Sequence, residues 1–214
     1  MTTQQLVDSL LALIGDTPCI PLPPALGVSH VYLKLEGFNP TGTIYDRLIL
    51  FSTFQGQDLL VTGSGAMCAA VALAGSVLQM PVTFQNEDQG LFAQMAEALG
   101  ARRASCVTQN ICFDAVAMIH DLIAEIQQEV PHVSTVCIPA LPLLPTHLQE
   151  SASVRLQWIP PTGSAPVMLS ALARLGVLID PQSASGVEQA CSMEHEVIVV
   201  VCAIDGAMAL AEKE

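Results

Sequence analysis

Positive charge is scarce in this sequence. Its 214 residues include seven Lys and Arg against twenty Asp and Glu, which gives a formal net charge of −13. Proteins that bind a nucleic-acid backbone need clustered cations, and Arg102-Arg103 is the only adjacent basic pair. We therefore expect neither nucleic acid nor an anionic membrane among the partners of this chain, and we assign the acidity to solubility.

Patterns typical of metal sites and disulfide frameworks are missing too. The sequence has no Cys-x-x-Cys pair, and no two of its five histidines are four residues apart. Its seven cysteines are an odd number, and some of them, such as Cys137 and Cys202, lie in apolar runs. We expect no metal site, and we expect buried, reduced thiols of a cytoplasmic protein.

Hydrophobic runs of membrane-spanning length are also lacking. The most apolar stretch, residues 66–82, is interrupted by Gly75, Ser76 and Gln79, and it is too short to cross a bilayer comfortably. No signal peptide is expected at the N-terminus. The chain is nevertheless 51% hydrophobic, with a mean hydropathy of +0.52. This excess predicts exposed apolar surface that a homodimer or another protein partner covers.

Segments with helical spacing alternate with short apolar segments along the chain. This order predicts an α/β fold in which parallel strands are joined by crossover helices. The predicted helices span residues 3–14, 66–79, 89–99, 111–129, 146–158 and 165–175. The predicted strands span residues 31–35, 58–62, 82–85, 103–108, 133–138 and 196–202. Residues 139–145 predict a proline-rich loop, and residues 180–195 predict a polar connector.

Residues 39–47 carry the most specific motif, with the sequence Asn-Pro-Thr-Gly-Thr-Ile-Tyr-Asp-Arg. This run resembles a motif of the cysteine synthase (O-acetylserine sulfhydrylase) family, whose members are fold-type II enzymes that use pyridoxal phosphate (PLP). The resemblance implies the three-layer, tryptophan synthase β-like fold of these enzymes, in a shortened form. It also implies a single unit over residues 1–214, with a smaller lobe at about 39–145 inserted in a larger lobe formed by 1–38 and 146–214. Further segments resemble the family in the same order, at residues 14–18, 31–36, 64–68, 79–83, 98–101 and 197–201.

Tyr45 stands where the family has the lysine that carries the cofactor as a Schiff base. A phenol has no amine, so it cannot condense with an aldehyde. The chain has only two lysines, and neither is placed to take over this role: Lys34 lies in a predicted strand well before the motif, and Lys213 is the penultimate residue. The resemblance therefore implies that the catalytic lysine is absent.

The glycine-containing loop at residues 64–68 also departs from the family. Ser64 and Gly65 are kept, and they place backbone N–H groups at a predicted helix N-terminus. The resemblance puts Ala66 at the asparagine that contacts the ring oxygen of the cofactor. It puts Met67 and Cys68 at residues that help to hold the substrate carboxylate. A methyl group cannot donate the hydrogen bond of an amide.

Two further contact positions lie towards the C-terminus. The family's phosphate loop corresponds to residues 160–166, where three prolines remove backbone donors. Only Thr162, Gly163 and Ser164 of that loop remain as vestigial contacts. Asp205 falls where the family has the serine that meets the pyridine nitrogen, and it is followed by glycine, as is common in turns.

These departures lead to three hypotheses. The first is a non-catalytic, cysteine synthase-like pseudoenzyme of amino-acid or natural-product metabolism that has lost PLP and binds a protein partner of its pathway. Cysteine synthases accept the C-terminal tail of serine acetyltransferase in their cleft, so the resemblance implies that a vestigial cleft could receive a peptide. The second is a PLP-independent enzyme that uses Cys68, Tyr45 or Asp205, and the third is a non-covalent binder of PLP or an amino acid. The residues expected to line the cleft are Thr41, Tyr45, Ser64, Met67 and Cys68.

Overall fold

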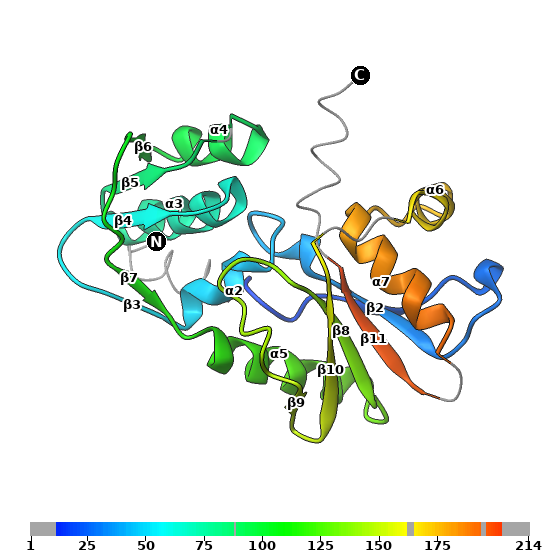
Figure 1. Cartoon of the computed structure of the whole chain (residues 1–214). Coiled ribbons are helices and arrows are strands. Elements are labelled where there is room, and N and C mark those ends of the chain that lie inside the picture. Colours follow the sequence, from blue (N-terminus) through cyan, green and yellow to red (C-terminus); the bar gives the residue numbers. More distant parts are fainter. Residues whose placement is uncertain (1–11, 88, 162–164, 194–195, 203–214) are drawn as a thin grey trace.

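The computed structural model describes residues 12–87, 89–161, 165–193 and 196–202. Its largest sheet has six strands in the order β1-β2-β11-β8-β10-β9 (Figure 1). The four inner strands are parallel, and the two edge strands are antiparallel to their neighbours. The strands are β1 Cys19–Pro21, β2 Val31–Leu35, β8 Thr135–Pro139, β9 Glu150–Ser151, β10 Val154–Ile159 and β11 Ile198–Cys202.

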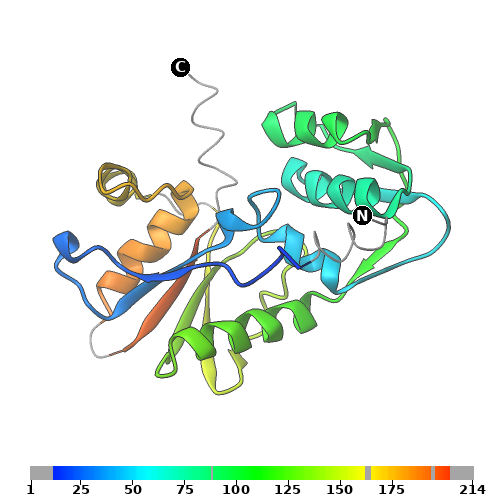
Figure 2. The same cartoon turned by 180° about the vertical axis from the view of Figure 1, so that it is seen from behind.

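Helices cover both faces of this sheet. Helix α5 (Ala115–Glu129) lies on one face, and α7 (Pro181–Cys191) and α6 (Pro166–Arg174) lie on the other, as the two opposite views show (Figures 1 and 2). Strand β11 is buried along its whole length because Val199 and Val201 pack into the α5 core while Ile198 and Val200 pack into the α7 core. This explains its unbroken run of apolar residues, which is typical of a parallel strand covered on both sides.

A second region of the chain forms its own small sheet. Strands β4 (Leu59–Thr62), β5 (Val82–Gln85) and β6 (Arg102–Arg103) are parallel, and helices α3 (Gly65–Leu78) and α4 (Leu91–Ala98) connect them. An antiparallel pair, β3 (Ser52–Phe54) with β7 (Ile111–Phe113), lies between this region and α5 (Figure 1). The remaining elements are the 3-10 turns η1 (Pro24–Leu26) and η2 (Glu36–Phe38) and the short helix α2 (Tyr45–Leu50).

Several elements agree closely with the sequence prediction, and the α/β fold class with parallel strands is confirmed. Strand β2 has the predicted bounds, and α3, β5, α6 and β11 are displaced by two residues at most. Of the predicted helix at residues 3–14, residues 3–11 lie outside the described part of the chain. The proposed division into a smaller and a larger lobe stays a prediction.

The predicted helix over residues 146–158 is wrong. This segment contains the hairpin of β9 and β10, which turns at Ala152 and Ser153 with φ of 49° and 64°. Val154 and Leu156 are buried and alternate with more exposed neighbours along β10. Their spacing of two residues indicates a strand, and their pairing with the buried strand β8 outweighs local helix propensity.

The predicted polar connector at residues 180–195 is also wrong, because most of it is helix α7. Asp180 is the N-cap and accepts a hydrogen bond from the Ser183 backbone N–H, and Pro181 occupies the first helical turn. The small buried residues of this helix allow close packing on the sheet. At Gly186, an added Cβ would lie 2.2 Å from Ile159 Cδ1 of β10.

Two predicted bounds need correction. The long helix predicted from residue 111 starts only at Ala115, because Ile111–Phe113 form β7 and Asp114 caps the helix by accepting from Ala117 N–H. The strand predicted over residues 103–108 is limited to Arg102–Arg103. Beyond it, the Val107 N–H is bound by the Gln85 side chain rather than by a neighbouring strand.

Among the described residues, no helix has the length and apolar character needed to cross a membrane. The same part of the chain contains no group of three or more His, Cys, Asp or Glu side chains arranged to hold a metal ion.

Candidate functional site

The motif at residues 39–47 forms a tightly bonded turn before helix α2. The Asn39 side chain accepts a hydrogen bond from Gly15 N–H and donates to the backbone oxygen and carboxylate of Glu36. Gly42 adopts a φ of 83°, a conformation that favours glycine. Thr41 donates its backbone N–H and its hydroxyl to the Asp46 carboxylate. The polar side chains of this motif therefore bond mainly to the protein itself.

Tyr45 is the first residue of α2, and its side chain is buried, with 1% of its surface exposed. It belongs to the core cluster that also contains Ala66, Met67 and Cys68 of α3. Its hydroxyl lies 3.5 Å from the backbone oxygen of Pro142, at the outer limit of a hydrogen bond. The structure thus brings together three of the five residues expected in the cleft, as members of a packed core.

The N-terminus of α3 is also occupied by contacts within the protein. Ser64 caps the helix by accepting a hydrogen bond from Met67 N–H at 3.3 Å. The Met67 side chain folds back over Gly63, since a Cβ built on that glycine would lie 2.2 Å from Met67 Cε. Thr41, the fifth predicted cleft residue, is buried and bonded to Asp46. Thr162, Gly163, Ser164 and Asp205 lie outside the described residues.

Cys68 is a poor candidate for a nucleophile. Its side chain is fully buried, and burial raises the pKa of the thiol to about 11, although the nearby charge of Arg103 acts to lower it. A thiol in this environment stays protonated at neutral pH, whereas reactive cysteines are thiolates in partly exposed, electropositive sites. The hypothesis of an enzyme that uses Cys68 has no support from this geometry.

Lys34 does not replace the missing amine. It lies on β2, its side chain is fully buried, and its ammonium donates to the backbone oxygen of Thr17 at 2.5 Å. It also forms ion pairs with Glu125 and Glu129 of α5. These three acceptors commit the Lys34 nitrogen to contacts within the protein.

Sequence reasoning missed the buried ionic cluster to which Lys34 belongs. Arg47 donates to Glu36 and to Glu125, so the cluster joins β2, η2, α2 and α5. Burial acts to raise the pKa of Glu125, but hydrogen bonds from Arg47 and Lys34 lower it to about 2. A charged residue inside an apolar strand was the available signal, because such a residue needs a buried partner of opposite charge.

Residues 10–131 match the family model described as pyridoxal-phosphate dependent enzyme. The chain belongs to this family. A search of curated proteins finds no match. The resemblance to this family is therefore confirmed, as is the fold class that it implies.

Several solved structures have a similar fold. The O-acetylserine dependent cystathionine beta-synthase from Helicobacter pylori matches with a TM-score of 0.72 and 18% identity, covering 96% of this chain and 97% of that one. An O-ureido-L-serine synthase matches with a TM-score of 0.71 and 14% identity, covering 94% and 93%. An O-acetyl serine sulfhydrylase, isoform 3, from Entamoeba histolytica gives 0.66 and 16%, covering 94% and 89%. At these identities the likeness shows the fold alone.

The expectation that this chain has lost PLP and uses no cofactor is wrong by this comparison, because the matched family is one of PLP-dependent enzymes. Each substitution removes one contact, and a phosphate or an aromatic ring can be held by others. The residues exclude only a covalent bond to the cofactor at residue 45. A buried phenol at residue 45 does not fit an imine with the cofactor.

Proposed function

We propose that this chain is a non-catalytic member of the PLP-dependent enzyme family that acts by binding a protein partner. The observation that carries the proposal is Tyr45, a buried phenol at the motif position where the cysteine synthases have their reactive lysine. Without an amine at this position, the chain has no group there for covalent catalysis. The commitment of Lys34 to its buried ion pairs supports the same conclusion.

An exposed apolar surface supports the binding role. Phe38 and Leu178 are each 68% exposed, and both line one hollow of about 290 Å³ with Ile20 and Val177. Exposed large apolar side chains that gather in one place are typical of protein-binding surfaces. We propose that a second copy of this chain, or an enzyme of the same biosynthetic pathway, covers this hollow.

Activity and assembly are tested separately. Purified chain supplied with PLP, O-acetylserine and sulfide is expected to form no cysteine, and measurable turnover would contradict the non-catalytic role. Sedimentation velocity of the chain, alone and mixed with an active cysteine synthase of its organism, is expected to show a complex. A monomer in both experiments would contradict the binding role.

A matched pair of variants tests the proposed surface. Leu178→Glu places a charge in the apolar hollow and is expected to weaken the complex at least about tenfold, because desolvating an unpaired carboxylate is costly. Gln128→Glu adds the same charge at an exposed position on α5 and is expected to leave the complex unchanged. Equal effects of the two substitutions would exclude this surface as the binding site.

A further inference from the structure

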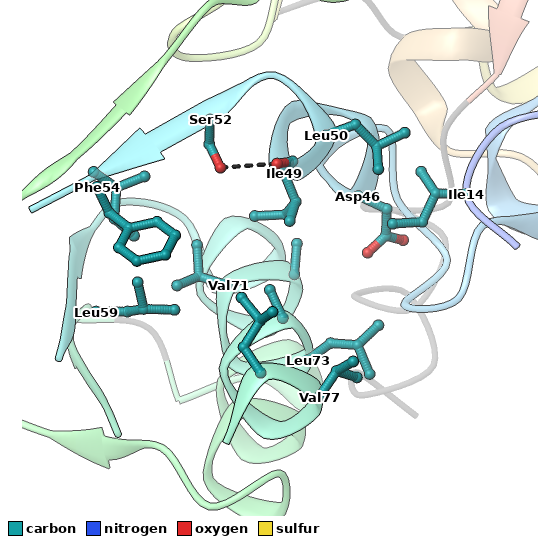
Figure 3. Close-up of a pocket in the computed structure, with 14 residues that line it drawn as sticks. Ile14, Asp46, Ile49, Leu50, Ser52, Phe54, Leu59, Val71, Leu73 and Val77 are labelled. Atoms are coloured by element: carbon teal, nitrogen blue, oxygen red, sulfur yellow. Dashed lines mark hydrogen bonds between the residues drawn. The ribbon is translucent and has the colours of Figure 1, made fainter. Parts of the chain in front are cut away.

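A different cavity, of about 180 Å³, lies between α2, α3 and the β3-β7 ribbon (Figure 3). Its wall is almost entirely apolar. Phe54 and Leu59 lie at one end, Ile14 and Leu50 lie at the other, and Leu73 and Val77 of α3 form one side (Figure 3). Water finds few hydrogen-bond partners on such a wall. An apolar cavity of this size therefore favours an apolar ligand.

Asp46 brings a carboxylate to this apolar wall. Its side chain is 1% exposed and lines the cavity (Figure 3). It accepts hydrogen bonds from the backbone N–H and the hydroxyl of Thr41, each at 2.9 Å. These donors are neutral. In the described part of the chain, none of the ion pairs includes Asp46.

A buried carboxylate without a cation is unusual, because removing the charge from water costs more than neutral hydrogen bonds return. Burial raises the pKa of Asp46 to about 6, although the hydrogen bonds from Thr41 act to lower it and the charge of Glu36 acts to raise it further. At neutral pH the group is therefore an anion held against an apolar cavity. A cation that enters the cavity would find an unmatched charge.

We propose that this cavity binds a small apolar primary amine, with its ammonium group donating to Asp46 and its hydrocarbon body against Leu73, Val77 and Phe54. Charge complementarity selects the ammonium, and the apolar wall selects a ligand with no second charge. A free amino acid is disfavoured because its own carboxylate would lie among apolar side chains. Tyr45 is not among the residues that line the cavity, and the proposal does not depend on the proposed function.

Isothermal titration calorimetry with 3-methylbutylamine at pH 8 tests the proposal on the intact chain. The control ligand is 3-methylbutanol, which has the same carbon skeleton without the charge. The amine is expected to bind at least about tenfold more tightly than the alcohol, since a hydrogen bond to a charged group is worth more than a neutral one. Equal affinities of the unmodified chain for the two ligands, or no binding of the amine, would overturn the proposal.

Three variants locate the binding. Asp46→Asn keeps the shape and removes the charge, so it is expected to lower amine affinity about tenfold and leave the alcohol unaffected. Asp58→Asn removes the same charge from an exposed position, so it is expected to change neither. Ala74→Leu fills the cavity and is expected to abolish binding of both ligands. Unchanged amine affinity in Asp46→Asn or in Ala74→Leu would place the amine elsewhere and overturn the proposal.

Discussion

Arg47 and Glu125 form two parallel hydrogen bonds, from Nη1 to Oε2 at 2.7 Å and from Nη2 to Oε1 at 2.9 Å. Glu36 accepts from Nε and Nη2 of the same guanidinium, at 2.6 Å and 2.9 Å. The guanidinium is thus fixed on two sides by carboxylates, and it ties α2 to α5 and η2. Since Tyr45 lies two residues before Arg47, this cluster also sets the position of the residue on which the proposed function depends.

Arg47→Met is expected to lower the free energy of unfolding by about 3–5 kcal/mol, because it leaves the fully buried Glu36 without a cation. Urea unfolding followed by circular dichroism measures the change. Arg155→Met breaks the largely exposed pair with Glu196 and should cost about 1 kcal/mol or less. Similar losses in both variants would mean that the buried cluster contributes no more than a surface pair.

Asp46 is expected to make stability depend on pH. Its pKa is raised from 3.8 to about 6 in the folded chain. The stability that the folded chain has with Asp46 protonated is therefore fully present below pH 3.8, and it is lost as the pH rises through 6. The loss amounts to roughly 3 kcal/mol, from the shift and the free energy per pKa unit.

The Asp46→Asn variant isolates this effect. Its stability relative to the wild type is expected to increase between pH 4 and pH 8, measured by urea unfolding at each pH. The Asp58→Asn variant changes an exposed carboxylate and should follow the wild type throughout. A constant difference between Asp46→Asn and the wild type over this range would contradict the raised pKa.

Gly75→Ala sets helix propensity against packing. Alanine is better than glycine in a helix by about 1 kcal/mol. The new Cβ, however, would lie 2.1 Å from Val82 Cγ2 and 2.9 Å from the Met80 backbone oxygen. Overpacking of this kind costs about 1–3 kcal/mol, so we expect a net loss of stability. Ser76→Ala, at an exposed position of the same helix, should change stability by less than about 0.5 kcal/mol, and a gain at Gly75 would show that α3 can move away from β5.

Tyr45→Lys is expected to restore no cysteine synthase activity. The new ammonium would be buried among Ala66, Met67 and Cys68, and unfolding experiments should show a loss of roughly 3 kcal/mol. Ala66 would still present a methyl group where the resemblance places an amide. Tyr45→Phe is the control, and it should stay within about 1 kcal/mol of the wild type because it keeps the buried ring and removes a hydroxyl that lies 3.5 Å from the Pro142 backbone oxygen. Turnover by Tyr45→Lys would mean that residue 45 alone separates this chain from an active enzyme.

The elements that were predictable from sequence are those whose buried residues form a simple apolar pattern. Strand β11 is a continuous apolar run and α3 is an apolar segment with a serine cap, so both were recognisable. The β9-β10 hairpin was not, because its turn residues, Ala152 and Ser153, are not the glycine or asparagine that usually adopt positive φ. Helix α7 was overlooked because its buried face is made of small and polar residues, such as Ser183 and Ser185.

In the candidate site, too, the sequence indicates local features but not those that the fold brings together. A local motif was enough to single out Tyr45. The ion pair of Lys34 with Glu129 joins residues 95 positions apart, so only the fold brings them together. The cavity beside Asp46 is likewise built from α2, β3, β4, α3 and β7, and no local pattern indicates it. The sequence also could not decide the question of the cofactor, because it shows which contacts are replaced but not which others remain.

Borohydride trapping shows whether any amine of the folded chain forms an imine with PLP. The native chain is incubated with PLP, reduced with borohydride, digested and analysed by mass spectrometry, with an active cysteine synthase as the positive control. The account predicts no stoichiometric phosphopyridoxyl adduct on the folded chain, since residue 45 is tyrosine and the Lys34 amine is held in buried ion pairs. A stoichiometric adduct on Lys34, formed without unfolding, would contradict it.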